Sequence, residues 1–282
     1  MPQTKTVLIT GASSGFGLLA SVALAKRGWH VIATMRDLGR RSLLEEPARA
    51  AGVGERIEVH ALDVTNSGQI ETIASEVGRR KVPLDAIVNN AGFALPGFAD
   101  DVTDAELRQQ FDTNFFGAAA VTRAFLPQLR RQGFGHIVMI SSVSGRMGFA
   151  GVGSYSASKF ALEGWTESLR YEMMPLGIQV VLIEPGAFET DIWTRNAKIA
   201  ENLTNPSSPN ATRVGRWQAK IQTGTKKGNP QPVIDRIVAV LENPRPKLRY
   251  VVGRDAKIGL LLRSLLPWSM FERLILKNMG LE

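Results

Sequence analysis

The sequence feature that most constrains the fold is an apolar strand that runs directly into a glycine-rich loop. The run Thr6–Thr10 leads into Thr-Gly-Ala-Ser-Ser-Gly-Phe-Gly, which occupies residues 10–17. Helical spacing follows from about residue 16 to residue 27, and Gly28 closes it. Glycines between a strand and a helix allow a tight turn and a close approach of the backbone to a pyrophosphate, which lies at the helix N-terminus. The pattern therefore predicts a strand–loop–helix unit that binds a dinucleotide.

Six further apolar runs read as strands, and amphipathic stretches separate several of them. The expected strands are residues 30–35, 57–62, 84–89, 136–140, 178–183 and 249–252, and the expected helices lie near 67–79, 103–131 and 155–174. Strands that alternate with helices form parallel βαβ units. The strand Ile178–Ile183 is apolar throughout, as suits a sheet covered on both faces. We therefore expect an α/β fold with one doubly wound domain and a parallel sheet of about seven strands.

Two segments depart from this alternation. Residues 202–232 carry four prolines among Ser, Thr, Asn and Gly, so we expect a long loop there. The tail combines basic residues with Leu, Trp and Phe, which suits a lid, a dimer contact or an interfacial helix. We expect the tail to form helices against the body near the substrate cleft, and we favour peripheral membrane contact less. The predicted division is a domain of residues 1–255, with a substrate loop at about 191–232, and a helical extension of residues 256–282.

Composition and charge exclude several classes of function. The chain has no cysteine, which excludes disulfides, thiolate metal sites and cysteine nucleophiles. His30, His60 and His136 are far apart and form no ligand pair, so we expect no metal site. The net charge of +8 lies entirely in residues 201–282, because residues 1–200 hold 20 basic and 20 acidic residues, and this argues against nucleic-acid binding. Neither a spanning apolar stretch nor a secretory signal is visible, so we expect a cytoplasmic protein.

A tyrosine and a lysine at helical spacing are the main catalytic candidates. Tyr155 and Lys159 are four residues apart, which places both side chains on one face of a helix. A free phenol has a pKa of about 10 and is a poor acid–base catalyst at neutral pH. A neighbouring ammonium group stabilises the phenolate and lowers that pKa. The pair is therefore expected to donate or accept a proton.

Two polar residues accompany this pair. Ser142 follows the expected strand at residues 136–140, and ligands bind outside the carboxyl ends of the strands in an open α/β sheet. Its hydroxyl is therefore placed to donate to a substrate carbonyl oxygen. Asn114 lies within a long helical stretch, where asparagine is only a middling helix former. Without further context, Asn114 reads equally well as a solvent-facing residue.

Taken in order along the chain, these motifs resemble the short-chain dehydrogenase/reductase superfamily, in the subgroup with a one-domain Rossmann fold. The motifs are the loop at 10–17, Asn-Asn-Ala-Gly at 89–92, Asn114, Ser142, the Tyr155/Lys159 pair and Pro-Gly-x-x-x-Thr at 185–190. The resemblance covers about residues 5–255. The run Ala-Thr-Met-Arg-Asp-Leu at 33–38 resembles the 17β-hydroxysteroid and retinol dehydrogenase branch.

The resemblance implies a role for each of these positions. Tyr155 is the general acid–base, Lys159 lowers its pKa and binds the nicotinamide ribose, and Ser142 orients the substrate oxygen. Asn114 helps to hold a water molecule that links Lys159 to solvent. The implied cofactor contacts are Thr10, Gly11, Ser13, Ser14, Gly15, Phe16, Gly17, Arg36, Asp63, Val64, Asn90, Ala91, Gly92, Tyr155, Lys159, Pro185, Gly186, Phe188 and Thr190.

The choice between NADP and NAD depends on the end of the second strand. An acid there would bind the adenine ribose hydroxyls of NAD, but Met35 occupies the expected position and Arg36 follows it. An arginine pairs well with a 2′-phosphate, so NADP is favoured over NAD. Asp37 is adjacent, and Ser14 stands where NADP-preferring members often have a basic residue. NAD therefore remains an alternative.

The predicted function is an NADP(H)-dependent oxidoreductase that transfers a hydride between nicotinamide and a hydrophobic secondary alcohol or ketone. The bulky candidates for the substrate lining are Phe93, Leu95, Met147, Phe149 and Trp193. A 3-oxoacyl-thioester reductase, a non-enzymatic NADP(H)-sensing protein and a nucleotide-sugar epimerase are the alternatives. Related proteins pair their helices across two-fold axes, so a homodimer or homotetramer is expected.

Overall fold

A single parallel sheet organises the computed structural model, which describes residues 4–80, 82–224 and 227–281. Its seven strands lie in the order β3-β2-β1-β4-β5-β6-β7, and every neighbouring pair is parallel. The strands are β1 Thr6–Ile9, β2 His30–Met35, β3 Ile57–Ala61, β4 Ala86–Asn89, β5 Gly135–Ile140, β6 Ile178–Pro185 and β7 Arg249–Val252. Both the strand number and the strand positions confirm the sequence-based prediction.

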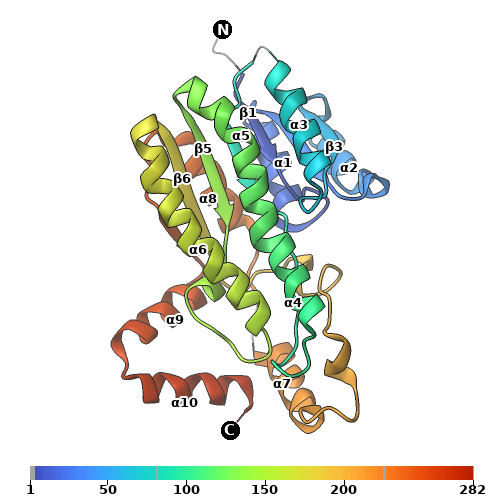
Figure 1. Ribbon diagram of the computed structural model, residues 1–282, viewed down its shortest axis with the longest axis vertical. Coiled ribbons are helices and arrows are strands. Elements are labelled where there is room, and N and C mark those ends of the chain that lie inside the picture. The colour runs from blue at the N-terminus through green and yellow to red at the C-terminus, as the bar shows by residue number, and fades with distance from the viewer. Residues whose placement is uncertain (1–3, 81, 225–226, 282) are drawn as a thin grey trace.

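Helices cover both faces of the sheet, as the apolar strands require (Figure 1). On one face, α1 (Gly15–Lys26), α2 (Ser42–Ala50) and α8 (Gln231–Glu242) share a buried apolar cluster with the strands. On the other face, α3 (Ser67–Arg79), α5 (Ala118–Gln132) and α6 (Gly153–Met173) form a second cluster. The fold is therefore doubly wound, and the carboxyl ends of all strands point toward one end of the molecule.

The helical stretch predicted at residues 103–131 is not one regular helix. It divides into α4 (Asp104–Phe111), a π-helical segment (Asp112–Gly117) and α5. Thr103 and Glu106 form a reciprocal capping box that begins α4, and Gly133, with a φ of 71°, ends α5. The π-helical segment carries Asn114, and such segments often occur at functional sites. Local spacing in the sequence does not reveal this irregularity.

The prediction of a long loop at residues 202–232 was wrong in part. The segment contains a short 3₁₀ turn (Glu201–Thr204) and the helix α7 (Ala211–Gly224). The prolines and most small polar residues that suggested a loop lie on either side of α7. Val214 and Trp217, three residues apart, face inward and are buried. Burial of these two side chains against the body stabilises a helix that composition alone argues against.

The tail folds as two helices, α9 (Arg254–Leu265) and α10 (Trp268–Met279), as predicted. They project beyond the sheet at its carboxyl end, and α10 extends toward α7 (Figure 1). Phe271 of α10 is buried in a cluster with Met147, and Met279 packs against the cluster that contains Tyr155. The tail therefore contributes apolar side chains to the region beyond the carboxyl ends of the strands.

Two histidines that the sequence separates contact the same carboxylate, which corrects the expectation that all three lie far apart. Nε2 of His30 lies 2.9 Å from Glu58 Oε1, and Nε2 of His60 lies 3.1 Å from Glu58 Oε2. The parallel pairing of β2 with β3 brings them together. Among the described residues, no three His, Cys, Asp or Glu side chains form a cluster able to hold a metal ion. Within the same residues, no helix has the length and apolar character to span a bilayer.

Candidate functional site

One continuous cleft of about 1600 Å³ lies outside the carboxyl ends of the strands. This is the position at which ligands bind in open α/β sheets. The cleft brings together most of the residues that the sequence singled out. Those that line it are Gly11, Ser13, Ser14, Gly15, Phe16, Arg36, Asp63, Val64, Asn90, Ala91, Gly92, Ser142, Tyr155, Lys159, Pro185, Gly186, Phe188 and Thr190. Thr10, Gly17 and Asn114 do not line it and instead support the residues that do.

The glycine-rich loop is held close to the turn that follows β4. Thr10 Oγ1 accepts hydrogen bonds of 3.0 Å from the backbone N–H groups of both Asn90 and Ala91. Gly11 has a φ of 69°, and a Cβ on it would lie 2.8 Å from Ala91 Cα. A side chain on Gly17 would place its Cβ 2.5 Å from the Gly11 carbonyl oxygen. These positions therefore require glycine, because the two loops must touch to shape the floor of the cleft.

The end of the cleft beside β2 is basic. Arg36 lines it and is exposed, whereas Met35 is fully buried, so an acid at position 35 would not face the cleft. Asp37 also lines this end, but its Oδ1 already accepts a hydrogen bond of 2.9 Å from the Gly39 N–H. Arg40 lines the cleft as well, and its buried Nη2 has no hydrogen-bond partner among the described residues. Two guanidinium groups, one with an unsatisfied donor, fit an anionic group such as a ribose 2′-phosphate.

On the opposite side, the segment after β6 is clamped to the tail. Asp255, at the start of α9, accepts a hydrogen bond of 2.8 Å from the Ala187 N–H through its Oδ2. Phe188 packs edge-on against Phe16 of the glycine-rich loop, with ring centroids 6.0 Å apart. The tail therefore helps to position the Pro185–Thr190 segment.

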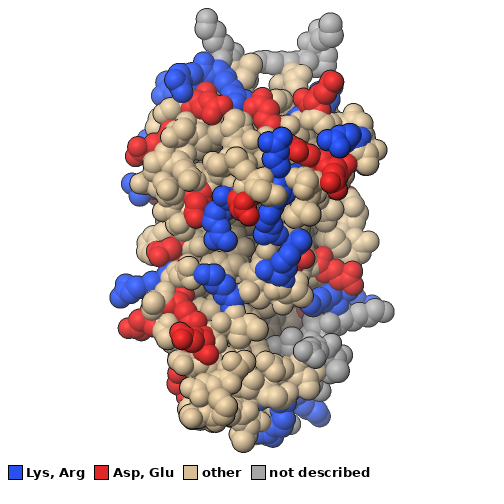
Figure 2. Space-filling model, turned by 90° about the vertical axis from the view of Figure 1, so that its right-hand side faces the viewer, with Lys and Arg blue, Asp and Glu red and all other residues tan. Residues whose placement is uncertain are grey.

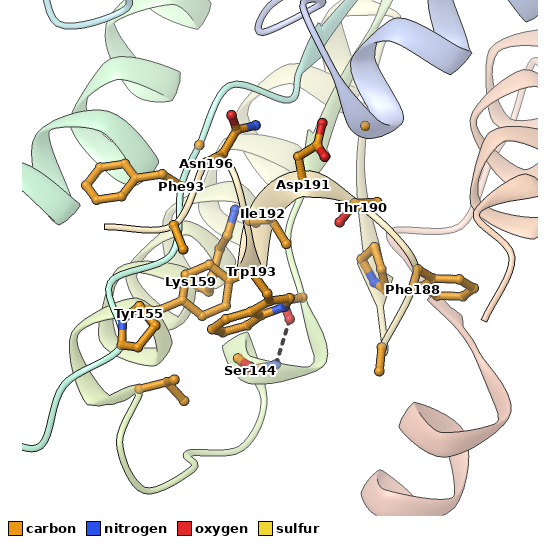
Figure 3. A pocket seen from close by; sticks show the side chains of 18 of the residues that line it. Phe93, Ser144, Tyr155, Lys159, Phe188, Thr190, Asp191, Ile192, Trp193 and Asn196 are labelled. Carbon is orange, nitrogen blue, oxygen red and sulfur yellow. Dashed lines mark hydrogen bonds between the residues drawn. The ribbon is translucent and has the colours of Figure 1, made fainter. Parts of the chain in front are cut away.

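Tyr155 and Lys159 lie at the centre of the cleft, where α6 passes the end of β5. The rings of Tyr155 and Trp193 meet edge to face, with centroids 5.3 Å apart and an angle of 66° between the ring planes (Figure 3). Lys159 Nζ lies 5.8 Å from the centroid of the Tyr155 ring and donates a hydrogen bond of 2.8 Å to the Ile140 carbonyl oxygen. Ser142 Oγ accepts a hydrogen bond of 3.1 Å from the Ser144 N–H, and the Ser142 hydroxyl is also hydrogen-bonded to Tyr155.

Burial dominates the pKa values of the pair. It raises the pKa of Tyr155 to about 12, against the smaller opposing effect of a hydrogen bond with Ser142. It also lowers the pKa of Lys159 to about 8, although the charge of Glu163 opposes this change. The expectation that Lys159 lowers the pKa of Tyr155 is therefore not met in the protein alone. The ammonium group donates to the Ile140 carbonyl oxygen, and desolvation of the phenolate dominates the pKa of Tyr155.

Asn114 is buried behind the wall of the cleft and fixes the segment after β4. Its Oδ1 accepts from the Phe93 N–H, and its Nδ2 donates to the Phe93 carbonyl oxygen, each at 3.0 Å. Nδ2 also lies 3.2 Å from Ser158 Oγ on α6. Asn114 is therefore not the solvent-facing residue of the alternative reading. Its implied role in a water relay to Lys159 stays a prediction.

Beyond Tyr155 the cleft widens into an apolar chamber. Phe93, Met147, Phe149 and Trp193 line it as predicted, but Leu95 packs into the core behind it and does not. Further lining side chains come from α7 and the segment before it, and from the tail: Leu203, Trp217, Ile258, Leu262, Phe271, Leu274, Ile275 and Met279. The end of the molecule where α7 lies is also mostly uncharged on the face shown in Figure 2. The chamber is therefore suited to an apolar ligand.

Three contributors to the cleft were not predicted from the sequence. Arg40 lies four residues after Arg36, and this helical spacing was the available signal. Trp217 lies within the segment read as loop, yet its Nε1 donates a hydrogen bond of 3.1 Å to the Ala150 carbonyl oxygen. Asp255 lies 68 residues from Ala187, and no local pattern connects two such distant positions.

Two related sequences align with most of this chain. The uncharacterised oxidoreductase YusZ of Bacillus subtilis is 42% identical over 98% of this chain and 98% of its own length. Retinol dehydrogenase 8 of Homo sapiens is 39% identical over 87% of this chain and 80% of its own length. The second relative agrees with the branch that residues 33–38 resemble.

Solved structures and a family model agree with these relatives. A short-chain dehydrogenase from Streptomyces avermitilis matches with a TM-score of 0.80 and 35% identity, over 96% of this chain and 98% of that one. A variant of actinorhodin polyketide ketoreductase, crystallised with NADPH, matches with a TM-score of 0.74 and 27% identity, over 89% and 95%. The family model described as short chain dehydrogenase matches residues 5–200. The chain therefore belongs to the short-chain dehydrogenase family and is an oxidoreductase.

Proposed function

We propose that the protein is an NADP(H)-dependent oxidoreductase that interconverts hydrophobic ketones and secondary alcohols. One observation carries this proposal: the Tyr155 side chain lies where a basic, loop-walled half of the cleft meets an apolar half. A dinucleotide in the first half and an apolar substrate in the second would meet at Tyr155.

The basic half of the cleft supports NADP(H) as the cofactor. Arg36 and Arg40 line its end, and guanidinium groups pair well with a phosphate group. The solved ketoreductase with the same fold was crystallised with NADPH. The contacts of the remaining lining residues with the cofactor are part of this proposal. We also propose that Asp37 does not bind the adenine ribose, because its carboxylate accepts a hydrogen bond from the Gly39 N–H.

Each residue of the central group has a separate task in the proposed reaction. When bound, NADP(H) supplies or accepts the hydride. The Ser142 O–H donates a hydrogen bond to the substrate oxygen, while the Ser144 N–H holds the Ser142 hydroxyl in place. The Tyr155 hydroxyl gives its proton to that oxygen during reduction and takes it back during oxidation. The Lys159 ammonium stabilises the phenolate that this transfer leaves behind.

The apolar half of the cleft indicates the substrate class. Trp193 lies against Tyr155, and Phe271 and Met279 bring apolar atoms from the tail to the same chamber. An aliphatic or polycyclic carbonyl compound would bury its apolar surface there, which is favourable by about 25 cal/mol for each Å² removed from water. The name of the relative retinol dehydrogenase 8 agrees with such a substrate.

The test is oxidation of NADPH in the presence of steroid ketones, retinal, long-chain ketones, 3-oxoacyl thioesters and small ketones. We expect turnover with one or more of the apolar ketones or aldehydes and little with small ketones. Turnover confined to thioesters would favour the 3-oxoacyl reductase. Binding of NADPH without turnover of any compound would favour a sensing protein.

A matched pair of variants links turnover to the proposed proton donor. Tyr155→Phe should reduce turnover by at least about 100-fold, because general acid catalysis typically contributes about 10²–10⁴-fold. Tyr171→Phe removes an exposed hydroxyl from the same helix and should leave turnover unchanged. If Tyr155→Phe retains near-normal turnover, the assignment of the proton donor is wrong.

A further inference from the structure

A buried cluster of charged groups lies directly behind the Tyr155–Lys159 pair, and the proposed reaction does not use it. Glu163 follows Lys159 by one helical turn on α6, and only 4% of its surface is exposed. Glu184 on β6 is completely buried. Two buried carboxylates this close to a catalytic lysine are costly, since a buried charge must be paired or must influence its neighbours.

Lys159 and Glu163 converge on two consecutive residues at the end of β5. Lys159 Nζ donates to the carbonyl oxygen of Ile140, while Glu163 lies beside the hydroxyl of the next residue, Ser141. A Cβ on Gly145 would be 2.9 Å from both Glu163 Cγ and Ser141 Oγ, so only a glycine fits against this pair. The helix register and the glycine together hold the carboxylate near the ammonium group.

Glu163 is not fully neutralised where it lies. Its Oε2 accepts a hydrogen bond of 3.0 Å from Arg249 Nε on β7. Its Oε1 is buried and has no hydrogen bond of standard geometry within the described part of the chain, and the same holds for Ser141 Oγ. One carboxylate oxygen therefore remains available to act on Lys159 through the low-dielectric interior.

Burial raises the pKa of both Glu163 and Glu184, but at Glu163 hydrogen bonds from Ser141 and Arg249 oppose the rise. Glu184 lies 3.3 Å from both Arg146 Nη1 and Arg249 Nε, but neither contact is short. Burial and the charge of Glu163 raise the pKa of Glu184 to about 7. The two carboxylates form a coupled pair in which Glu184 is the one that takes up a proton.

We propose that Glu163 is a positioning residue whose buried carboxylate keeps Lys159 protonated, and with it the Tyr155–Lys159 pair in the form that donates a proton to a carbonyl. The part that concerns turnover rests on the proposed reductase function. The part that concerns Lys159 does not, because it is an electrostatic property of the protein alone. The charged groups around Glu163 are Lys159 and Glu167 on α6, Arg146 after β5, Glu184 on β6 and Arg249 on β7.

The first experiment measures Lys159 directly, by NMR of protein labelled at the lysine side chains. The Lys159 signal is assigned by its loss in Lys159→Met. In Glu163→Gln, the removal of a negative charge should lower the titration midpoint of Lys159 by about one pH unit. Glu163→Asp keeps the charge and should restore most of the wild-type midpoint. An unchanged midpoint in Glu163→Gln would overturn the proposal, whatever the substrate.

The second experiment uses the pH profile of carbonyl reduction by the same variants. Reduction requires the protonated pair, so the loss of activity at high pH should occur about one unit lower in Glu163→Gln. At pH values above the midpoint of the wild-type protein, turnover by Glu163→Gln should be about tenfold lower than wild-type turnover. NADPH affinity and thermal unfolding, measured alongside, show whether the variant is folded.

Glu167→Gln is the matched control. Glu167 also pairs with Arg249, through Oε2 and Nη2, but it lies a further turn along α6 and is 40% exposed. If Glu163 merely anchors Arg249, both variants should shift the titration and the pH profile equally, and the proposal fails. A shift confined to Glu163→Gln supports it. If the titration shifts but the wild-type protein reduces no carbonyl compound, the electrostatic assignment stands and the proposed function fails.

Discussion

Glu184 makes stability depend on pH in a direction that the structure predicts. Its side chain has 0% exposed surface, and burial, followed by the charge of Glu163, raises its pKa from 4.5 to about 7. In the unfolded chain the carboxyl group returns to a pKa near 4.5. Between these values the folded state holds the proton more tightly than the unfolded state does. This group therefore contributes stability that is fully present below about pH 4.5 and is lost as the pH rises through about 7.

The size of the effect follows from the difference between the two pKa values. At about 1.36 kcal/mol for each unit, Glu184 should lower the free energy of unfolding by about 3 kcal/mol between about pH 4 and about pH 8. Glu184→Gln keeps the shape and an acceptor oxygen for the two arginines but does not ionise. Urea unfolding at the two pH values should show a smaller loss of stability in this variant than in the wild-type protein, by about 3 kcal/mol.

A control and a clear refutation accompany this measurement. Glu242→Gln removes a carboxylate from an exposed ion pair with Arg27, so its pH dependence should match that of the wild-type protein. If Glu184→Gln and the wild-type protein lose the same free energy between the two pH values, Glu184 is ionised throughout the range. The two arginines would then outweigh burial, and the reasoning about the coupled carboxylates would be wrong.

Three further outcomes are expected. Arg36→Ala should weaken NADPH binding about 10- to 100-fold and leave NADH binding unchanged, because only NADPH carries the 2′-phosphate. Fluorescence titration measures both affinities, and Arg41→Ala, which lies outside the cleft, is the control. Light scattering at micromolar concentration should show a homodimer or homotetramer, and a monomer would contradict the prediction; the exposed Phe116 and Phe160 support a contact through this side of the protein. Deletion of residues 267–282 should raise the KM for an apolar ketone, since Phe271 then no longer lines the chamber. Robust, salt-sensitive flotation of the intact protein with anionic vesicles, if it is lost on this deletion, would show that the tail is a membrane anchor instead.

Most of the cofactor half of the site was predictable from short stretches of sequence. The Thr10–Gly17 loop, the segment after β4 and the Tyr155/Lys159 pair each carry their geometry within a few residues. Turns that need a positive φ and side chains one helical turn apart leave local marks in a sequence. For the same reason the seven strands were placed to within two residues at each end.

The substrate half was less predictable because its walls come from distant parts of the chain. Leu95 is as apolar as Phe93, yet only Phe93 faces the chamber. Trp217 belongs to a helix that forms because its apolar face meets the body, and the flanking prolines concealed it. Which apolar side chains line a cavity depends on how separate elements pack, and their sequence spacing does not contain that information.

The sequence by itself therefore determined the doubly wound parallel sheet, the position of the glycine-rich loop and the placement of Tyr155 and Lys159 on one helix face. These features follow from strand and helix periodicity and from turns that need glycine. Only the tertiary structure decided the electrostatics around that pair. Glu163, Glu184 and Arg249 come from three separate elements, and the order of β5, β6 and β7 in the sheet brings them together behind Lys159. Desolvation and charge act through space, so the pKa values of these groups are set by neighbours that the chain reaches only when folded.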